Sequence, residues 1–256
     1  MLWNSSGLHG YALMASDGAF GTVSDFLFSD LSWGVRWLVA DTGDWLPGRK
    51  VLIHPSALNA PDAQSRQIPV KLTKTQIAAS PGIGSDMPVS MQMETQLYDH
   101  YGWDPAWGET YTLSGAMSAP VVLPLFDRGA DNAPRSYAEP HAGNGDPHLR
   151  SANGVEGYHI HASDGDIGHV GDFILEDAGW MISHFKVETS NWWIGNTVLI
   201  PCRSIRKIEW SDRLVTVDLT RQQVKDSPEY RRSETVDGMF DDMSFISNNV
   251  NWIAPM

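Results

Sequence analysis

Residues 15–26 read ASDGAFGTVSDF, and residues 162–173 read ASDGDIGHVGDF. The two stretches lie 147 positions apart, and the similarity continues without a gap when residues 10–83 are placed on 157–230. Of these 74 aligned pairs, 25 are identical. Gap-free self-similarity over such a length is typical of two copies of one folding unit. We therefore expect an internally duplicated chain in which both copies have the same strand order.

Each copy has the pattern of short strands separated by turns. Alternating apolar and polar residues in the first copy predict five strands, over residues 11–15, 21–28, 33–40, 50–54 and 67–72. Strands this short, with Gly and Asp between them, favour a small antiparallel barrel. Thr73 with Gln76, and Thr220 with Gln223, fit the capping box that starts a helix. The expected fold is mainly β: two small antiparallel β-barrels related by internal duplication, with short helices after each.

This interpretation divides the chain into five segments. Residues 84–114 have apolar and aromatic residues at helical spacing, whereas 115–153 are rich in Gly, Pro, Asn and Asp without a period. The segments are a first barrel (8–83), an aromatic helical extension (84–114), a linker (115–153), a second barrel (154–230), and a C-terminal helix and tail (231–256).

Composition argues against several classes of partner. The 256 residues carry a formal net charge of −13, and none of these segments has the surplus of Lys and Arg that phosphate binding needs. We therefore expect no nucleic-acid partner, and the lack of an 18-residue apolar run predicts no direct membrane insertion. Cys202 is the single cysteine, and the N-terminus lacks the features of a signal peptide, so we expect a cytoplasmic protein.

The repeated motif resembles the PRC-barrel family. The motif is Asp-Gly, two residues, then Gly-x-Val-x-Asp-Phe, followed by a strand bearing Trp, then Trp-x-x-Gly and Val-Leu-Ile. The family includes the cytoplasmic domain of the photosynthetic reaction-centre H subunit and free-standing bacterial proteins, and residues 88–103 are similar to the helix that follows the barrel in the latter. The resemblance implies an interaction module without catalytic residues or cofactors.

We therefore expect a non-catalytic interaction, scaffold or regulatory protein that acts on a protein partner. The alternative is a module that senses a small ligand or metal in a groove between the barrels, and a hydrolase of unknown type is a third hypothesis. None of the common nucleophile, phosphate-binding, dinucleotide or zinc-protease motifs occurs in the chain.

A metal site is conceivable on the second copy. His159 and His161 lie on one face of an expected strand, and His169 is nearby in sequence. The equivalent residues of the first copy are Ala12, Met14 and Thr22, so the fold does not require these histidines. A polar strand face is the simpler interpretation.

Aromatic residues give the stronger indication of an interface. Trp33 and Trp180 recur at equivalent positions and are expected to serve the barrels or the contact between them. The aromatic residues without such a counterpart are candidates for partner binding or homo-oligomer contacts: Tyr98, Tyr101, Trp103, Trp107 and Trp193.

Two further features have simple structural interpretations. Arg203, Arg206 and Lys207 form a basic patch that could dock an acidic partner but is more typical of a solvated surface. Asp25 and Asp172 recur in both copies, which favours a structural role over a ligand role.

Overall fold

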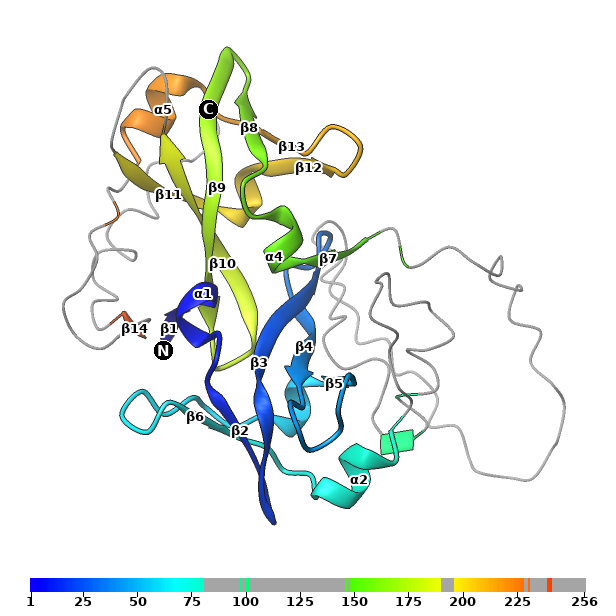
Figure 1. Cartoon of the computed structure of the whole chain (residues 1–256). Helices are drawn as coiled ribbons and strands as arrows, with labels where there is room; N and C mark the ends of the chain where they lie inside the picture. The colour runs from blue at the N-terminus through cyan, green and yellow to red at the C-terminus, as the bar shows by residue number, and fades with distance from the viewer. Residues whose placement is uncertain are drawn as a thin grey trace, which may run out of the picture.

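The computed structural model describes residues 1–80, 148–189 and 196–227, the single positions 97, 100, 101, 146 and 230, and the backbone of 239–240 (Figure 1). We call residues 1–80 repeat 1 and residues 148–227 repeat 2. Repeat 1 contains β1 (Leu2–Asn4), α1 (Ser5–Leu8), β2 (Ala12–Ala15), β3 (Gly18–Ser29), β4 (Val35–Asp41), β5 (Lys50–Ile53), η1 (Pro55–Ala57), β6 (Gln67–Pro69) and α2 (Lys74–Ala78).

Repeat 2 has the same elements in the same order, with one strand more. They are β7 (Leu149–Ser151), α4 (Ala152–Val155), β8 (His159–Ala162), β9 (Gly165–Glu176), β10 (Met181–Thr189), β11 (Thr197–Pro201), η2 (Cys202–Ser204), β12 (Ile205–Glu209), β13 (Leu214–Val217) and α5 (Arg221–Lys225). A short strand, β14 (Met239–Phe240), follows. The protein is therefore mainly β, as predicted.

The strands of each repeat pair in the same order. Repeat 1 forms the sheet β5-β4-β3-β2-β6, and repeat 2 forms β11-β10-β9-β8-β13-β12. Most pairs are antiparallel, but β2 pairs with β6 in parallel, and β8 pairs with β13 in parallel. The capping boxes at Thr73 and Thr220 both form. Positive φ angles also recur 147 residues apart, at Gly10 and Gly157, Gly18 and Gly165, Trp33 and Trp180, and Arg66 and Arg213.

The expectation of closed antiparallel barrels is not confirmed. The described strands form two mixed sheets that remain open. The long strand β3 pairs with β2 along its first half, and farther along the same edge it pairs with β7 from the other repeat. The end strands β5 and β6 of the repeat 1 sheet do not pair with each other, so this sheet stays open.

The two repeats exchange their first strand and helix. β1 pairs with β9 of repeat 2, and β7 pairs with β3 of repeat 1 (Figure 1). The registers are equivalent, because Trp3 lies opposite Leu175 and Arg150 lies opposite Phe28. The structural repeat therefore includes residues 2–8 and 149–155, ahead of the boundaries expected from sequence. Most of the second segment, residues 149–153, lies inside the expected linker.

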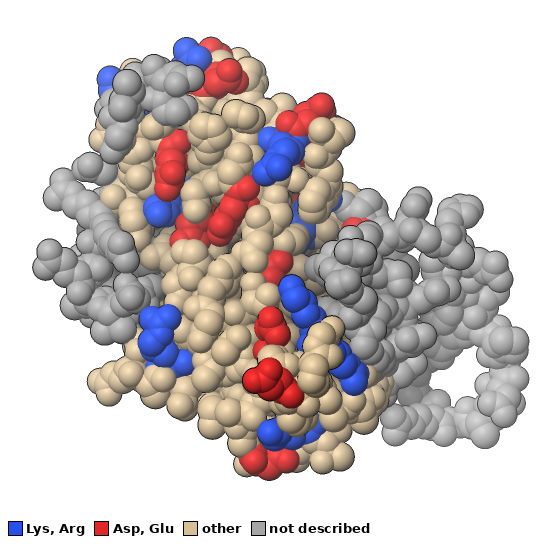
Figure 2. All heavy atoms as spheres, in the orientation of Figure 1, with Lys and Arg blue, Asp and Glu red and all other residues tan. Residues whose placement is uncertain are grey.

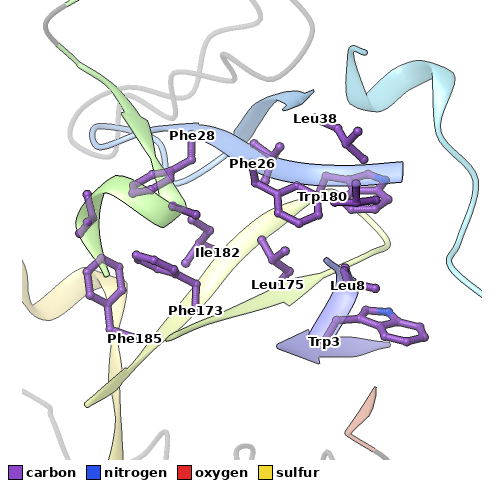
Figure 3. Packing of buried hydrophobic residues seen from close by; sticks show 14 of the residues in the cluster. Trp3, Leu8, Phe26, Phe28, Leu38, Phe173, Leu175, Trp180, Ile182 and Phe185 are labelled. Carbon is purple, nitrogen blue, oxygen red and sulfur yellow. The ribbon is translucent and has the colours of Figure 1, made fainter. Parts of the chain in front are cut away.

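One hydrophobic core runs through both repeats. Phe28 lies 5.5 Å from Phe173 between ring centroids, and Phe26 lies 6.0 Å from Trp180 (Figure 3). Trp33 and Trp180 thus serve the contact between the repeats. Close to them, the backbone N–H of Val35 donates to Trp180 O at 2.7 Å, and that of Ile182 donates to Trp33 O at 2.8 Å. These equivalent bonds place a pseudo-two-fold axis between the β3–β4 and β9–β10 turns.

Candidate functional site between the repeats

A pocket of about 170 Å³ opens between the two repeats, and we call it the inter-repeat pocket. Its lining residues come from the β3–β4 turn of repeat 1 and from two segments of repeat 2. They are Asp30, Leu31 and Trp33, then His148 and Arg150, then Ile205, Arg206, Lys207 and Ile208.

Asp30 of repeat 1 binds two lining residues of repeat 2. Arg150 Nε donates to Asp30 Oδ2 at 2.7 Å, and His148 Nδ1 lies 2.9 Å from Asp30 Oδ1. The backbone N–H of Asp30 donates to His148 O at 2.9 Å. The turn is set by Ser29, whose hydroxyl accepts from the N–H of Leu31 at 3.3 Å. The guanidinium of Arg150 is buried and lies 5.6 Å from the ring centroid of Trp210.

Arg206 and Lys207 supply the accessible positive charge of the pocket. Their side chains are 65% and 66% exposed. Arg206 pairs with Asp218 at 2.8 Å, and Lys207 pairs with Glu209. Exposed pairs of this kind contribute only about 0–1 kcal/mol, so both cations remain available to another anion.

The pseudo-equivalent place in the other half has fewer charged side chains. Asp177, the counterpart of Asp30, accepts from Trp3 Nε1 at 3.0 Å, where Asp30 accepts from Arg150, and it pairs with the N-terminal ammonium of Met1 at 2.5 Å. At four further positions, the pocket side has a charged or larger side chain than the equivalent place. Repeat 2 has Arg206, Lys207 and Trp210 where repeat 1 has Asn59, Ala60 and Ala63, and repeat 1 has Leu31 where repeat 2 has the smaller Ala178. Arg206, Lys207, Leu31 and Trp210 thus gather at one of two equivalent places, whereas the other place has the N-terminal ammonium and the exposed side chain of Met1.

On the described part of the face in Figure 2, charges of both signs are interspersed and no large area has a single sign. The accessible cations of the inter-repeat pocket are therefore a local feature.

The two recurring aspartates bind the exchanged helices. Asp172 is 2% exposed and accepts from Ser5 Oγ at 2.6 Å and from the N–H of Ser6 at 3.1 Å. Asp25 accepts from Ser151 Oγ at 2.5 Å and from the N–H of Asn153 at 3.1 Å. Burial raises the pKa of Asp25, and its hydrogen bonds oppose that shift. Each carboxylate therefore holds the helix that comes from the other repeat, which is the structural role expected of it.

The histidines of the metal hypothesis are only partly brought together. His159 and His169 lie opposite each other on β8 and β9, with ring centroids 4.7 Å apart. His161 Nδ1 instead lies 2.7 Å from Asp166 Oδ1. In the described part of the chain, no group of three or more His, Cys, Asp or Glu side chains could hold a metal ion.

Of the five aromatic interface candidates, the structure describes Tyr101. This residue packs against the core that runs through the repeats and against a second cluster on repeat 1 that includes Leu97. Tyr98, Trp103, Trp107 and Trp193 lie outside the described residues. Cys202 is buried, and burial raises the pKa of its thiol well above the ordinary value, which disfavours the reactive thiolate.

Sequence reasoning noticed Arg206 and Lys207 but missed Asp30, His148 and Arg150. The last two lie inside the expected linker. Extending the 147-residue offset toward the N-terminus places Arg150 on Trp3, but residues 1–8 and 148–155 share only a leucine and a glycine, which is too little to reveal the relation.

Comparison with known proteins adds no name to these features. No family model matches the chain, and neither does any curated protein. No helix among the described residues is long and apolar enough to cross a membrane.

Proposed function

We propose that this chain is a non-catalytic interaction protein, built from two PRC-type units fused through exchanged segments, and that its inter-repeat pocket receives an acidic side chain of a protein partner. The PRC-type assignment is supported by the repeated motif, in which the Asp of Gly-x-Val-x-Asp-Phe holds an exchanged helix in both repeats. A non-catalytic role is supported by the structural use of Asp25 and Asp172 and by the burial of Cys202.

The observation that carries the proposal is the one-sided chemistry of the pocket. The pseudo-equivalent place around Asp177 has the same strand order and turn conformations, but it lacks counterparts of Arg206, Lys207 and Leu31. The fold therefore does not require these side chains at this place. Exposed residues that the fold does not need are available for binding.

The size and composition of the pocket favour the end of a side chain over a cofactor. A volume of about 170 Å³ is smaller than the roughly 300–1,000 Å³ of typical small-molecule sites. It accommodates a carboxylate group beside the guanidinium of Arg206 and the ammonium of Lys207. Leu31 is 65% exposed at the pocket and Trp210 is 48% exposed beside Arg150, so both offer apolar contacts to the rest of a partner.

A peptide array tests this proposal. The peptides carry one to three Glu or Asp residues at varied spacing from a Leu or Phe, and fluorescence anisotropy measures the affinity of those that bind. The double variant Arg206→Asn, Lys207→Ala gives repeat 2 the residues of repeat 1, and we expect about tenfold weaker binding, close to 1.4 kcal/mol. The matched control Lys50→Ala, Lys225→Ala removes the same charge elsewhere and should bind like the wild type.

Three results discriminate between the hypotheses. Equal binding by both double variants would show that the pocket is not the docking site. Failure of the wild-type protein to bind any acidic peptide would overturn the proposal. Citrate or inorganic phosphate binding to the wild type more tightly than every peptide would instead favour the small-ligand module.

A further inference from the structure

His9 and Glu156 occupy equivalent positions with opposite chemistry. Each directly follows an exchanged helix, because His9 is the C-cap of α1 and Glu156 is the C-cap of α4. The following glycines also match. The N–H of Gly10 donates to Val23 O at 2.9 Å, and the N–H of Gly157 donates to Val170 O at 2.7 Å. The backbone is thus the same on both sides, and one side has an acid where the other has a base.

Both side chains lie half-buried, close to the two aspartates that hold the helices. His9 Nε2 and Glu156 Oε1 are buried, and neither has a hydrogen-bond partner among the residues that the structure describes. Burial lowers the pKa of His9, although Asp25 and Asp172 oppose this shift. His9 is therefore neutral at and above neutral pH.

Glu156 responds in the opposite direction. Burial, together with the charges of Asp172 on β9 and Asp25 on β3, raises its pKa to about 7, and Lys186 on β10 opposes this shift. Ionisation of Glu156 thus places a third negative charge close to two carboxylates, with one lysine to offset them. Neutral His9 adds no such charge beside α1.

The β7–α4 segment joins this cluster to the inter-repeat pocket. Arg150 pairs with Asp30 in the pocket, and the next residue, Ser151, donates to Asp25. The segment then passes through α4 to Glu156. The seven residues from Arg150 to Glu156 therefore connect a lining residue of the pocket with the acid that titrates.

We propose that Glu156 makes the β7–α4 segment a proton-sensitive clasp between the repeats, which docks more tightly when Glu156 is protonated and loosens when it ionises. The β1–α1 segment has His9 at the equivalent place and therefore does not loosen as the pH rises. Loosening of the clasp also frees Arg150 from the pocket wall. That last consequence rests on the proposed function, whereas the clasp does not.

The direction follows from linkage. A carboxyl group whose pKa is raised in the docked state stabilises docking fully below its ordinary value of 4.5, and this contribution is lost as the pH rises through about 7. Between about pH 6 and about pH 8.5, the undiscounted shift corresponds to roughly a tenfold change in the docking equilibrium. Because Glu156 is half-buried and partly screened by solvent, we expect a change of roughly three- to tenfold.

Hydrogen exchange of the full-length protein tests the clasp without any ligand. Protection factors, which correct for the intrinsic pH dependence of exchange, are measured for the amides of Glu156 and Gly157 and for their counterparts His9 and Gly10. We expect protection of Glu156 and Gly157 to fall roughly three- to tenfold from about pH 6 to about pH 8.5. Protection of His9 and Gly10 should not fall.

Glu156→Gln should abolish the fall at Gly157, and His9→Gln is the matched control that should leave it in place. If Glu156→Gln does not fold, Glu156→His copies the residue of repeat 1 and serves the same purpose. A fall at Gly157 that persists in these Glu156 variants, an equal fall at Gly10, or no fall in the wild type would each overturn the proposal. Because no ligand is present, each of these outcomes is independent of whether the pocket binds acidic peptides.

Discussion

The β1–α1 and β7–α4 segments have the same place and register in the fold but share few side chains. Trp3 on β1 corresponds to Arg150 on β7, and His9 after α1 corresponds to Glu156 after α4. What the two segments have in common is their recognition by an aspartate of the opposite repeat. The comparison shows that the two segments meet the same backbone requirements of the fold with side chains of different charge.

Substitutions at two equivalent glycines should have the largest effects on the free energy of unfolding, and they test whether the two repeats respond alike. A Cβ on Gly21 would collide with the carbonyl oxygen of Asp41, and a Cβ on Gly168 would collide with that of Glu188. We expect Gly21→Ala and Gly168→Ala each to lower the free energy of unfolding by about 3 kcal/mol, because neither backbone oxygen can move aside easily. Urea denaturation measures both.

Gly171→Ser is the matched control for the glycine prediction. Repeat 1 has Ser24 at this place, and the atoms nearest to a Cβ on Gly171 belong to the Glu188 side chain, at 2.8 Å and beyond. Since that side chain can rotate away, we expect a loss below about 1 kcal/mol. A tolerated Gly168→Ala beside a destabilising Gly21→Ala would break the equivalence of the repeats.

The two helix-binding aspartates should come next in size. Asp172→Ala removes an acceptor for both Ser5 and Ser6, and we expect it to lower the free energy of unfolding by about 3 kcal/mol. Asp25→Ala is expected to cost about 2 kcal/mol, because Asp25 is less buried. Thermal and urea unfolding at about pH 6, where Glu156 is protonated, measure both. If either variant is as stable as the wild type, that carboxylate does not hold its exchanged helix.

The smallest effects are expected where the repeats differ on the surface. Leu31→Ala copies Ala178, and Arg206→Asn with Lys207→Ala copies Asn59 and Ala60. Each change should alter the free energy of unfolding by less than about 0.5 kcal/mol, because these side chains are exposed. Equilibrium unfolding checks this directly. A loss above about 2 kcal/mol would show that the fold depends on these residues and would weaken the case for a binding face.

Much of the architecture could be predicted because it depends on local patterns. The 25 identities indicated equal strand order, and the Thr–Gln spacing predicted both capping boxes, which form. The exchange could not be predicted in this way. β1 and β7 are three residues each and share only their first leucine, so their relation falls below what sequence similarity detects.

The inter-repeat pocket escaped prediction for a related reason. Asp30 and Arg150 are 120 positions apart, and pairing over such a distance is set by tertiary packing. The closed barrels were expected from strand length and turn spacing alone. Those signals do not reveal that part of the β3 edge is already occupied by β7.

The exchange also has a consequence for how the chain folds during synthesis. Ser151 and Asp25 are separated by 126 positions, so repeat 1 leaves the ribosome long before its edge partner exists. Until β7 and α4 have been made, part of the β3 edge and the Asp25 carboxylate lack the groups that cover them. Exposed strand edges promote aggregation, and contacts between distant residues slow folding. The first half of this protein therefore reaches its native state only after most of the chain has been translated.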